Sequence, residues 1–250
     1  LRLSAPDGDL ELLLAQINAL LDRHEQETRD LRAREEGLRK QISNISHDLR
    51  TPLTSILGYL QLLEREDLSP EERSSYLATI EARSRTLQTL ITAFYDLSRI
   101  EGGEYPLQPE PVDLHRVLSD LLAGFYNDFE QRGFTVQVEL DGDLPPVRAD
   151  RNGAVRVLSN LLNNALKHGG QALTVRLYRD GDALITSFSN LAPTLTQEDL
   201  PHIFDRFYTA DQMRTGQNTG LGLAIVRALV QRMGHSVWAR LDGQVFTIGV

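Results

Sequence analysis

The chain has 250 residues, of which 41% are hydrophobic, so it can form one large domain or two ordinary ones. Its formal charge of -9 argues against a surface for nucleic acid or anionic membranes, because both partners favour clustered lysine and arginine. The absence of cysteine excludes disulfides, thiolate nucleophiles and cysteine-based zinc sites.

A long helix is predicted from about residue 10 to residue 66, because aliphatic residues recur at heptad spacing through residues 10–49. The two heptad series are Leu10, Ile17, His24, Leu31, Leu38 and Ile45, and Leu14, Leu21, Thr28, Glu35, Ile42 and Leu49. Nine of these twelve positions are aliphatic, which indicates a coiled-coil seam and therefore a partner helix.

The run from Ser46 to Thr54 places a histidine on the outer face of this helix. With Ile45 at heptad position d, His47 takes position f, farthest from the seam, and Thr51 shares its face four residues later. An exposed histidine is most often only a solvated surface residue. Here, however, Pro52 is expected to bend the helix one turn further on, which favours a functional site.

A second helix is predicted from Pro70 to the glycine pair at 102–103. Ser69 can cap it, Pro70 suits the first helical position, and Glu72 completes a capping box. Its apolar stripe, which is expected to pack antiparallel on the first helix, consists of Leu77, Ile80, Leu87, Leu90, Ile91, Phe94 and Leu97. Two such hairpins from two chains would form a four-helix bundle, so a homodimer is expected.

The residues from 104 onward predict a mixed α and β domain. Helices are expected from Asp113 to Gln131, from Asp150 to His168, over 196–204 and from Gly220 to Met233. Strands are expected over 134–140, 173–178 and 183–189, with a final hairpin of 236–241 and 244–248 about Asp242-Gly243. A polar loop precedes Gly220.

Two clusters in this domain suggest phosphate chemistry. Asn160, Asn164, Lys167 and His168 share one face of the helix over 150–168. Amide oxygens suit Mg²⁺, and a lysine beside them can neutralise phosphate. The pair Gly220 and Gly222 would let backbone N–H groups approach an anion at a helix N-terminus, although a tight turn explains such a pair equally well.

The order of these pieces resembles the sensor histidine kinases of two-component signalling. The matching motifs are Ser-His-Asp-Leu-Arg-Thr-Pro from Ser46, the asparagine helix from Asn160, Ile-Phe-Asp-Arg-Phe-Tyr from Ile203, and Gly-Leu-Gly-Leu-Ala-Ile from Gly220. The resemblance implies an α+β architecture, in which a dimeric helical hairpin precedes a Bergerat-type α/β sandwich that binds ATP. The expected parts are a signal-transmitting coiled coil at 1–45, a phosphotransfer hairpin at 46–103 and a catalytic domain at 104–250.

The resemblance also implies roles for residues of the hairpin. His47 would be phosphorylated by ATP and would pass the phosphoryl group to an aspartate of a response regulator. Asp48 would accept or orient the other ring proton, and Thr51 would position water for phosphatase activity toward the regulator. The resemblance places this part of the protein in the cytoplasm. An inner-membrane anchor upstream of residue 1 in a longer parent protein is left open, because the chain starts at leucine.

In the ATP domain, the resemblance makes Asn164 the principal Mg²⁺ ligand, with Asn160 accompanying it, and brings Lys167 and His168 to the nucleotide. Asn190 stands where the family has an adenine-binding aspartate, and its carbonyl can still accept a hydrogen bond from an amine. Asn218 stands where another glycine is common. The remaining expected nucleotide-binding residues are Phe204, Arg206, Phe207, Thr219, Gly220, Leu221 and Gly222.

Two other readings stay open. One is a pseudokinase that serves as a dimeric signalling scaffold with a degenerate nucleotide site. The other is a related ATPase or serine kinase, such as an anti-sigma factor, which would share the ATP domain but lack the histidine hairpin.

Overall fold

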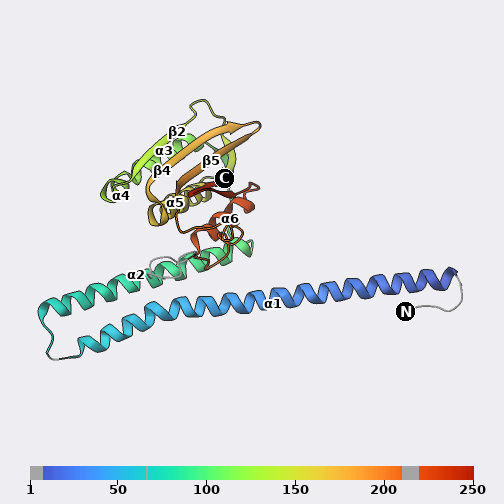
Figure 1. Ribbon diagram of the computed structural model, residues 1–250, viewed down its shortest axis with the longest axis horizontal. Helices are drawn as coiled ribbons and strands as arrows, with labels where there is room; N and C mark the ends of the chain where they lie inside the picture. The colour runs from blue at the N-terminus through green and yellow to red at the C-terminus, as the bar shows by residue number, and fades with distance from the viewer. Residues whose placement is uncertain (1–7, 66, 210–219) are drawn as a thin grey trace. The chain divides into compact units, whose positions relative to one another are not determined.

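The computed structural model describes residues 8–65, 67–209 and 220–250 (Figure 1). Its elements are α1 (Gly8–Leu63), α2 (Pro70–Glu101), β1 (Pro109–Val112), α3 (Leu114–Gly124), α4 (Tyr126–Gln131), β2 (Thr135–Leu140), β3 (Val147–Asp150), α5 (Arg151–His168), β4 (Gly170–Asp180), β5 (Ala183–Leu191), α6 (Gly222–Arg232), β6 (Trp238–Asp242) and β7 (Val245–Gly249). The chain divides into two compact units, one ending at Arg50 and the other running from Thr51 to Val250. Within the described ranges, no helix combines the length and the apolar character that crossing a bilayer requires.

The first unit consists of the N-terminal part of α1. Two residues of the predicted heptad series, Leu21 and Leu31, are 53% and 65% exposed in the single chain. Exposed leucines at seam positions match the expectation of a partner helix. The helix continues through Pro52 without interruption up to Leu63.

The second unit begins with the end of α1 and with α2, whose start follows the predicted capping box. The Ser69 hydroxyl accepts a hydrogen bond from the Glu72 backbone N–H at 3.1 Å, and the Glu72 carboxylate accepts one from the Ser69 N–H at 2.9 Å. Three residues of α2, namely Leu90, Leu97 and Ile100, are buried, and the helix packs against α6. Leu77 and Ile91 of the predicted stripe are instead 52% exposed.

A five-stranded sheet in the order β2-β4-β5-β7-β6 forms the centre of the second unit. Strands β2 and β4 are parallel and the other pairs are antiparallel. The core lies between one face of this sheet and the helices, and its largest fully buried side chains include Leu118, Leu161, Leu162, Leu173, Leu177, Phe188, Leu229 and Ile248. Strands β1 and β3 pair separately in a small antiparallel sheet.

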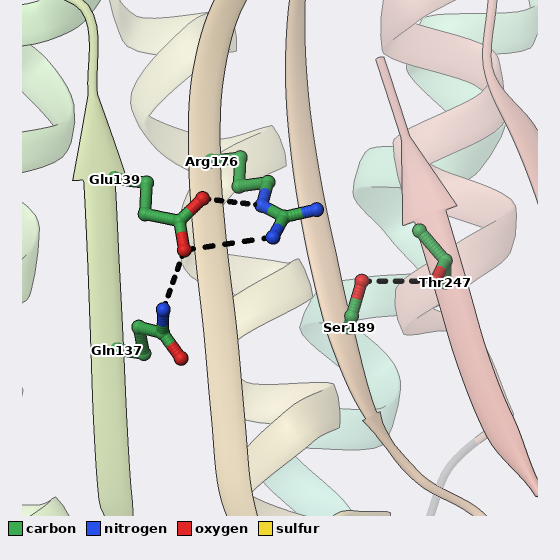
Figure 2. Close-up of polar contacts among 5 residues, drawn as sticks. All are labelled: Gln137, Glu139, Arg176, Ser189 and Thr247. Atoms are coloured by element: carbon green, nitrogen blue, oxygen red, sulfur yellow. Dashed lines mark hydrogen bonds and ion pairs between the residues drawn. The ribbon is translucent and has the colours of Figure 1, made fainter.

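The opposite face of the sheet is polar. Figure 2 shows Glu139 of β2, Arg176 of β4, Ser189 of β5 and Thr247 of β7 in front of the strands, with the helices passing behind. Arg176 Nε lies 2.6 Å from a Glu139 carboxylate oxygen, and the Ser189 and Thr247 hydroxyls are 2.9 Å apart. Since helices cover one face only, the fold is the expected two-layer α/β sandwich.

The predicted helix over 196–204 is wrong, because this segment forms successive turns. The Asp199 N–H donates to the Thr196 carbonyl and the His202 N–H to the Asp199 carbonyl, both three residues back. Asp199 also accepts from the Thr196 N–H and hydroxyl at 2.8 Å, and Pro201 has no N–H to continue a helix.

The other predicted helices form, with two differences at their boundaries. The helix expected over 113–131 is divided into α3 and α4 at Phe125, although Asp113 caps α3 as predicted. Helix α6 begins at Gly222 rather than Gly220, because Gly220 has a left-handed φ of 61° that a helix does not allow.

Candidate active site

A cleft of about 760 Å³ lies in the second unit, beside the C-terminal half of α5. From α5 it is lined by Asn160, Asn163, Asn164, Lys167 and His168, and from the segment that includes the start of α6 by Tyr208, Gly220, Gly222 and Leu223. Further lining residues are Asn190, Ala192, Thr194, Leu195, Ile203, Thr209, Ile225 and Phe246, and α2 adds Arg85, Thr86, Thr89 and Ala93. Glycine and asparagine residues that are distant in the sequence therefore meet in one cleft.

Helix α5 presents its polar face to this cleft because its apolar face is fixed in the core. The Asp150 carboxylate caps the helix by accepting from the Gly153 N–H at 2.6 Å. Val157, Leu161 and Ala165 are buried on the other side. Burial of one face thus leaves Asn160, Asn164 and Lys167 facing the cleft.

The Asn160 side chain lies close to the start of α6. Its amide nitrogen donates to the Arg156 carbonyl at 2.8 Å, which directs the amide oxygen the other way. A Cβ atom at Gly222 would lie 3.3 Å from that oxygen, so glycine allows the two helices to approach closely here. The Asn160 oxygen is therefore placed at the cleft, where a hard cation could bind.

The ionisable groups that line the described part of the cleft favour anions. They include Arg85, Lys167 and His168, and no carboxylate is among the lining residues. Burial lowers the pKa of the Lys167 ammonium, and the nearby Arg132 guanidinium lowers it further. A partly desolvated cation in a chain of charge -9 suits a ligand that brings its own negative charge.

Asn190 lies at the end of β5 and is 6% exposed. Its amide nitrogen donates to the Leu191 carbonyl at 3.0 Å, so its amide oxygen can accept from a ligand. Its side chain also packs beside Gly169, where an added Cβ would lie 3.1 Å from the Asn190 Cβ.

Four of the predicted nucleotide-binding residues do not line the cleft. Leu221 and Phe207 are buried, and Phe204 lies with its ring 6.0 Å from the Arg227 guanidinium carbon. Arg206 forms an ion pair with Glu101 at the end of α2. Thr219, like Asn218, lies outside the described residues.

Tyr208 and Asp199 form a polar pair at the rim of the cleft that was not predicted from the sequence. The Tyr208 hydroxyl donates a hydrogen bond to the Asp199 carboxylate. Desolvation and this bond raise the pKa of Tyr208 to about 12, and the bond is the main cause that lowers the pKa of Asp199. The motif at 203–208 contains Tyr208 but did not predict its partner, because Asp199 lies in the stretch that was predicted to be helical.

The predicted phospho-acceptor belongs to the first unit and is exposed. The His47 side chain is 64% accessible, and its Nδ1 lies 3.1 Å from Asp48 Oδ1. The side chains of these adjacent residues therefore do meet, although their Cβ atoms point to different sides of the helix. Thr51 is also exposed on α1.

Two protein families match successive parts of the chain. The family described as His Kinase A (phospho-acceptor) domain matches residues 38–103, and the Histidine kinase-, DNA gyrase B-, and HSP90-like ATPase family matches residues 149–250. The chain belongs to the sensor histidine kinases of two-component systems. It is a protein histidine kinase, and the match to the first family argues against an ATPase or serine kinase without the hairpin.

Curated relatives support this assignment. The kinase is 27% identical to sensor histidine kinase YcbM of Bacillus subtilis over 93% of its own chain and 76% of that protein. It is 30% identical to sensor histidine kinase WalK of the same organism, over 96% of this chain but 39% of WalK. It spans 65% of sensor protein GtcS of Aneurinibacillus migulanus. The kinase thus corresponds to only part of several relatives.

Solved structures show the same fold. Histidine kinase AdeS of Acinetobacter baumannii matches with a TM-score of 0.63 and 26% identity, over 82% of this chain and 96% of AdeS. Histidine kinase ThkA, solved in complex with the response regulator protein TrrA, matches with a TM-score of 0.70 and 22% identity. That match covers 91% of this kinase and 65% of the other chain.

Proposed function

We propose that this kinase transfers the terminal phosphoryl group of ATP to His47 and then to an aspartate of a response regulator. The observation that carries the proposal is the exposed His47 imidazole with its Nδ1 at Asp48. When Asp48 accepts the Nδ1–H, the lone pair of the ring is on Nε2, which makes Nε2 the nucleophile. As the Nε2–P bond forms, the P–O bond to the β-phosphate breaks and ADP leaves, while Asp48 stabilises the positive ring.

The cleft beside α5 is proposed as the ATP site. Lys167, His168 and the absence of carboxylates from the described lining suit the phosphates, and the oxygen of the buried Asn190 amide would accept from the adenine amino group. Gly220, which precedes α6, and Gly222, its first residue, would bring backbone near the ligand. Four further residues do not line the described part of the cleft and would support its walls in this assignment, namely Phe204, Arg206, Phe207 and Leu221.

Mg²⁺ fits the donor set of this cleft. No group of three His, Asp or Glu side chains that could hold a metal occurs among the described residues, so the protein ligands would be amide oxygens. Asn164 and Asn160 would supply them, and waters and phosphate oxygens would complete the shell. When bound, the ion would neutralise charge on the transferring phosphoryl group.

A homodimer is proposed from the apolar surface that the single chain leaves exposed on its hairpin. Leu53, Leu57 and Leu60 of α1 are 44–53% exposed, and Leu77 and Ile91 of α2 are 52% exposed. A second copy would cover them in a four-helix bundle. Thr51 remains the proposed residue for positioning water in phosphatase activity, and the complex of ThkA with TrrA is the precedent for the regulator as partner.

The decisive experiment is labelling with [γ-³²P]ATP and Mg²⁺ in the wild type, His47→Gln and His24→Gln. His24 is a matched control, because it is an exposed histidine on the same helix. The expected label is acid-labile, absent in His47→Gln and unchanged in His24→Gln. Label that persists in His47→Gln would refute the assignment, and a wild type that takes no label would support a pseudokinase.

A further inference from the structure

One wall of the nucleotide cleft comes from the helical hairpin. Arg85, Thr86, Thr89 and Ala93 of α2 line the same cleft as Asn164 and Lys167. All of these residues lie within the second compact unit. A ligand in the cleft would therefore meet a surface outside the ATP-binding domain.

Arg85 is the group on this wall that can donate to an anion. The Thr86 hydroxyl donates to the Ala82 carbonyl at 3.0 Å and the Thr89 hydroxyl to the Arg85 carbonyl at 2.9 Å. Each hydroxyl has a single proton to donate, and both are directed back into α2. The Arg85 guanidinium, in contrast, has five N–H donors arranged to suit carboxylate and phosphate.

The present partner of Arg85 is a carboxylate that a phosphate can replace. Arg85 Nη2 lies 2.6 Å and its Nε 3.1 Å from the same Glu81 oxygen, one turn earlier on α2. The Arg85 and Glu81 side chains are 76% and 64% exposed, so their pairing stabilises little. A phosphate in the cleft would offer more charge and more acceptor oxygens.

The position of α2 favours the phosphate end of a nucleotide over its base. The Arg156 guanidinium lies 2.5 Å from the Asp96 carboxylate of α2, so α2 runs beside α5. Further back along α2, Arg85 lines the cleft together with Asn164 and Lys167, the residues proposed for Mg²⁺ and phosphate. The proposed adenine partner Asn190 is on β5 and buried. The terminal phosphate is the part of ATP that extends farthest from the base.

We infer that Arg85 binds the terminal phosphate of ATP, exchanging Glu81 for the γ-phosphate, and so discriminates ATP from ADP. The inference rests on the proposed ATP site and adds to it a substrate contact from the hairpin. After transfer to His47, ADP no longer presents a γ-phosphate, and Arg85 returns to Glu81. The contact thus favours binding of ATP and release of ADP.

Calorimetric titration of the whole chain with a non-hydrolysable ATP analogue and with ADP, each with Mg²⁺, tests this inference. Arg85→Ala should weaken the analogue about tenfold and leave ADP unchanged, since one charge-assisted hydrogen-bonding partner is lost. Arg85→Lys should lie between, and Glu81→Gln should tighten the analogue. Arg73→Ala, an exposed arginine on the same helix that does not line the cleft, should match the wild type.

The ratio of the two affinities separates the outcomes. Equal weakening of the analogue and ADP in Arg85→Ala would mean that Arg85 only holds the cleft together, and no weakening would mean that it contacts neither; both results overturn the inference. A wild type that binds neither nucleotide would overturn the proposed ATP site as well. His47-dependent labelling in the wild type with an unchanged affinity ratio would overturn the inference alone.

Discussion

Arg156 of α5 and Asp96 of α2 form an ion pair across the boundary between the ATP-binding domain and the hairpin, with 2.5 Å between Nη2 and Oδ2. Their side chains are only 27% and 23% exposed, so solvent screens this pair less than the surface pairs of α1 and α2. Because α2 is the segment that joins the two parts, this pair holds the catalytic domain against the helix from which it extends.

Breaking this pair should loosen the contact between α5 and α2. In a double-mutant cycle, Asp96→Asn and Arg156→Gln should show a coupling energy of about 1 kcal/mol in urea unfolding. The charge-exchanged double variant, Asp96→Arg with Arg156→Asp, should regain part of the stability that either exchange alone loses. Strictly additive single effects would show that the pair contributes nothing.

Gly220→Ala should reduce nucleotide binding in the cleft more than the replacement of a glycine elsewhere in the domain. Gly220 has a φ of 61°, and an added Cβ would lie 2.6 Å from the Phe207 Cα and backbone carbon. Gly181→Ala is a matched control, since its φ is 60° but nothing lies within 4 Å of an added Cβ. Both variants should lose about 1–2 kcal/mol from the left-handed backbone.

The clash with Phe207 applies to Gly220→Ala alone, so only this variant should also lose nucleotide affinity in calorimetry. The Phe207 N–H donates to the Gly220 carbonyl at 2.9 Å, and displacement of either residue breaks that bond. Equal ATP affinity in the two variants would show that this close approach is not needed for binding.

The affinity for ATP should fall as pH rises, because Lys167 loses its proton. The fall should begin at a lower pH than it would if the pKa of Lys167 were that of an ordinary lysine. The pKa of Lys167 is lowered, chiefly by burial, so the ammonium loses its proton early and with it the attraction for phosphate. Binding constants measured between about pH 7 and 10 should show this decline in the wild type but not in Lys167→Arg, which keeps its charge. Parallel pH profiles for both proteins would contradict a role for this amine.

Tyr208→Phe should reduce stability by about 1 kcal/mol near neutral pH and less in strong alkali. The pKa of Tyr208 is raised to about 12 in the folded chain, so its stabilising contribution is present below the unfolded value near 10 and is lost as pH rises toward 12. The pKa of Asp199 is lowered, so its contribution is present at neutral pH and is lost as pH falls through the acid range.

The stability lost in Tyr208→Phe can be measured by urea unfolding at about pH 8 and about pH 11. These two values lie on either side of the pKa of an unfolded tyrosine. Tyr178→Phe is the control, because Tyr178 is also half-buried but lies on β4, in another part of the domain. If the wild type and Tyr208→Phe differed equally at both pH values, the hydrogen bond to Asp199 would not be the cause.

Local signals made most of the fold predictable. Ser69, Asp113 and Asp150 each cap the helix that was predicted to follow them, because a capping side chain acts on backbone within three residues. The hairpin about Asp242 and Gly243 is likewise fixed by its turn.

Other elements depend on contacts that local patterns do not contain. Strands β1 and β3 have only four residues each, so they show little alternation. The prolines at 109 and 111 also argue against a strand at β1, because proline lacks the N–H that a sheet uses. The segment over 196–204 has apolar spacing that suits a helix, but Asp199 and Pro201 favour turns.

The candidate site shows the same division. The polar face of α5 follows from helical periodicity, so Asn160, Asn164 and Lys167 could be predicted to lie together. The contribution of Arg85 to the cleft depends on how α2 packs against the domain, which no local pattern reveals. The expected contact of Arg206 with the nucleotide stays a prediction, and its ion pair with Glu101 of α2 is likewise a contact that no local pattern reveals.

Helix α5 keeps packing and binding on separate faces. Its buried side holds Val157, Leu161 and Ala165 against the sheet, whereas Asn164 faces the cleft. A replacement of Asn164 would thus remove the proposed Mg²⁺ ligand and leave the folded subunit with its own His47. Combined with a His47→Gln copy in the proposed dimer, such a subunit would take up phosphate only if transfer runs between subunits.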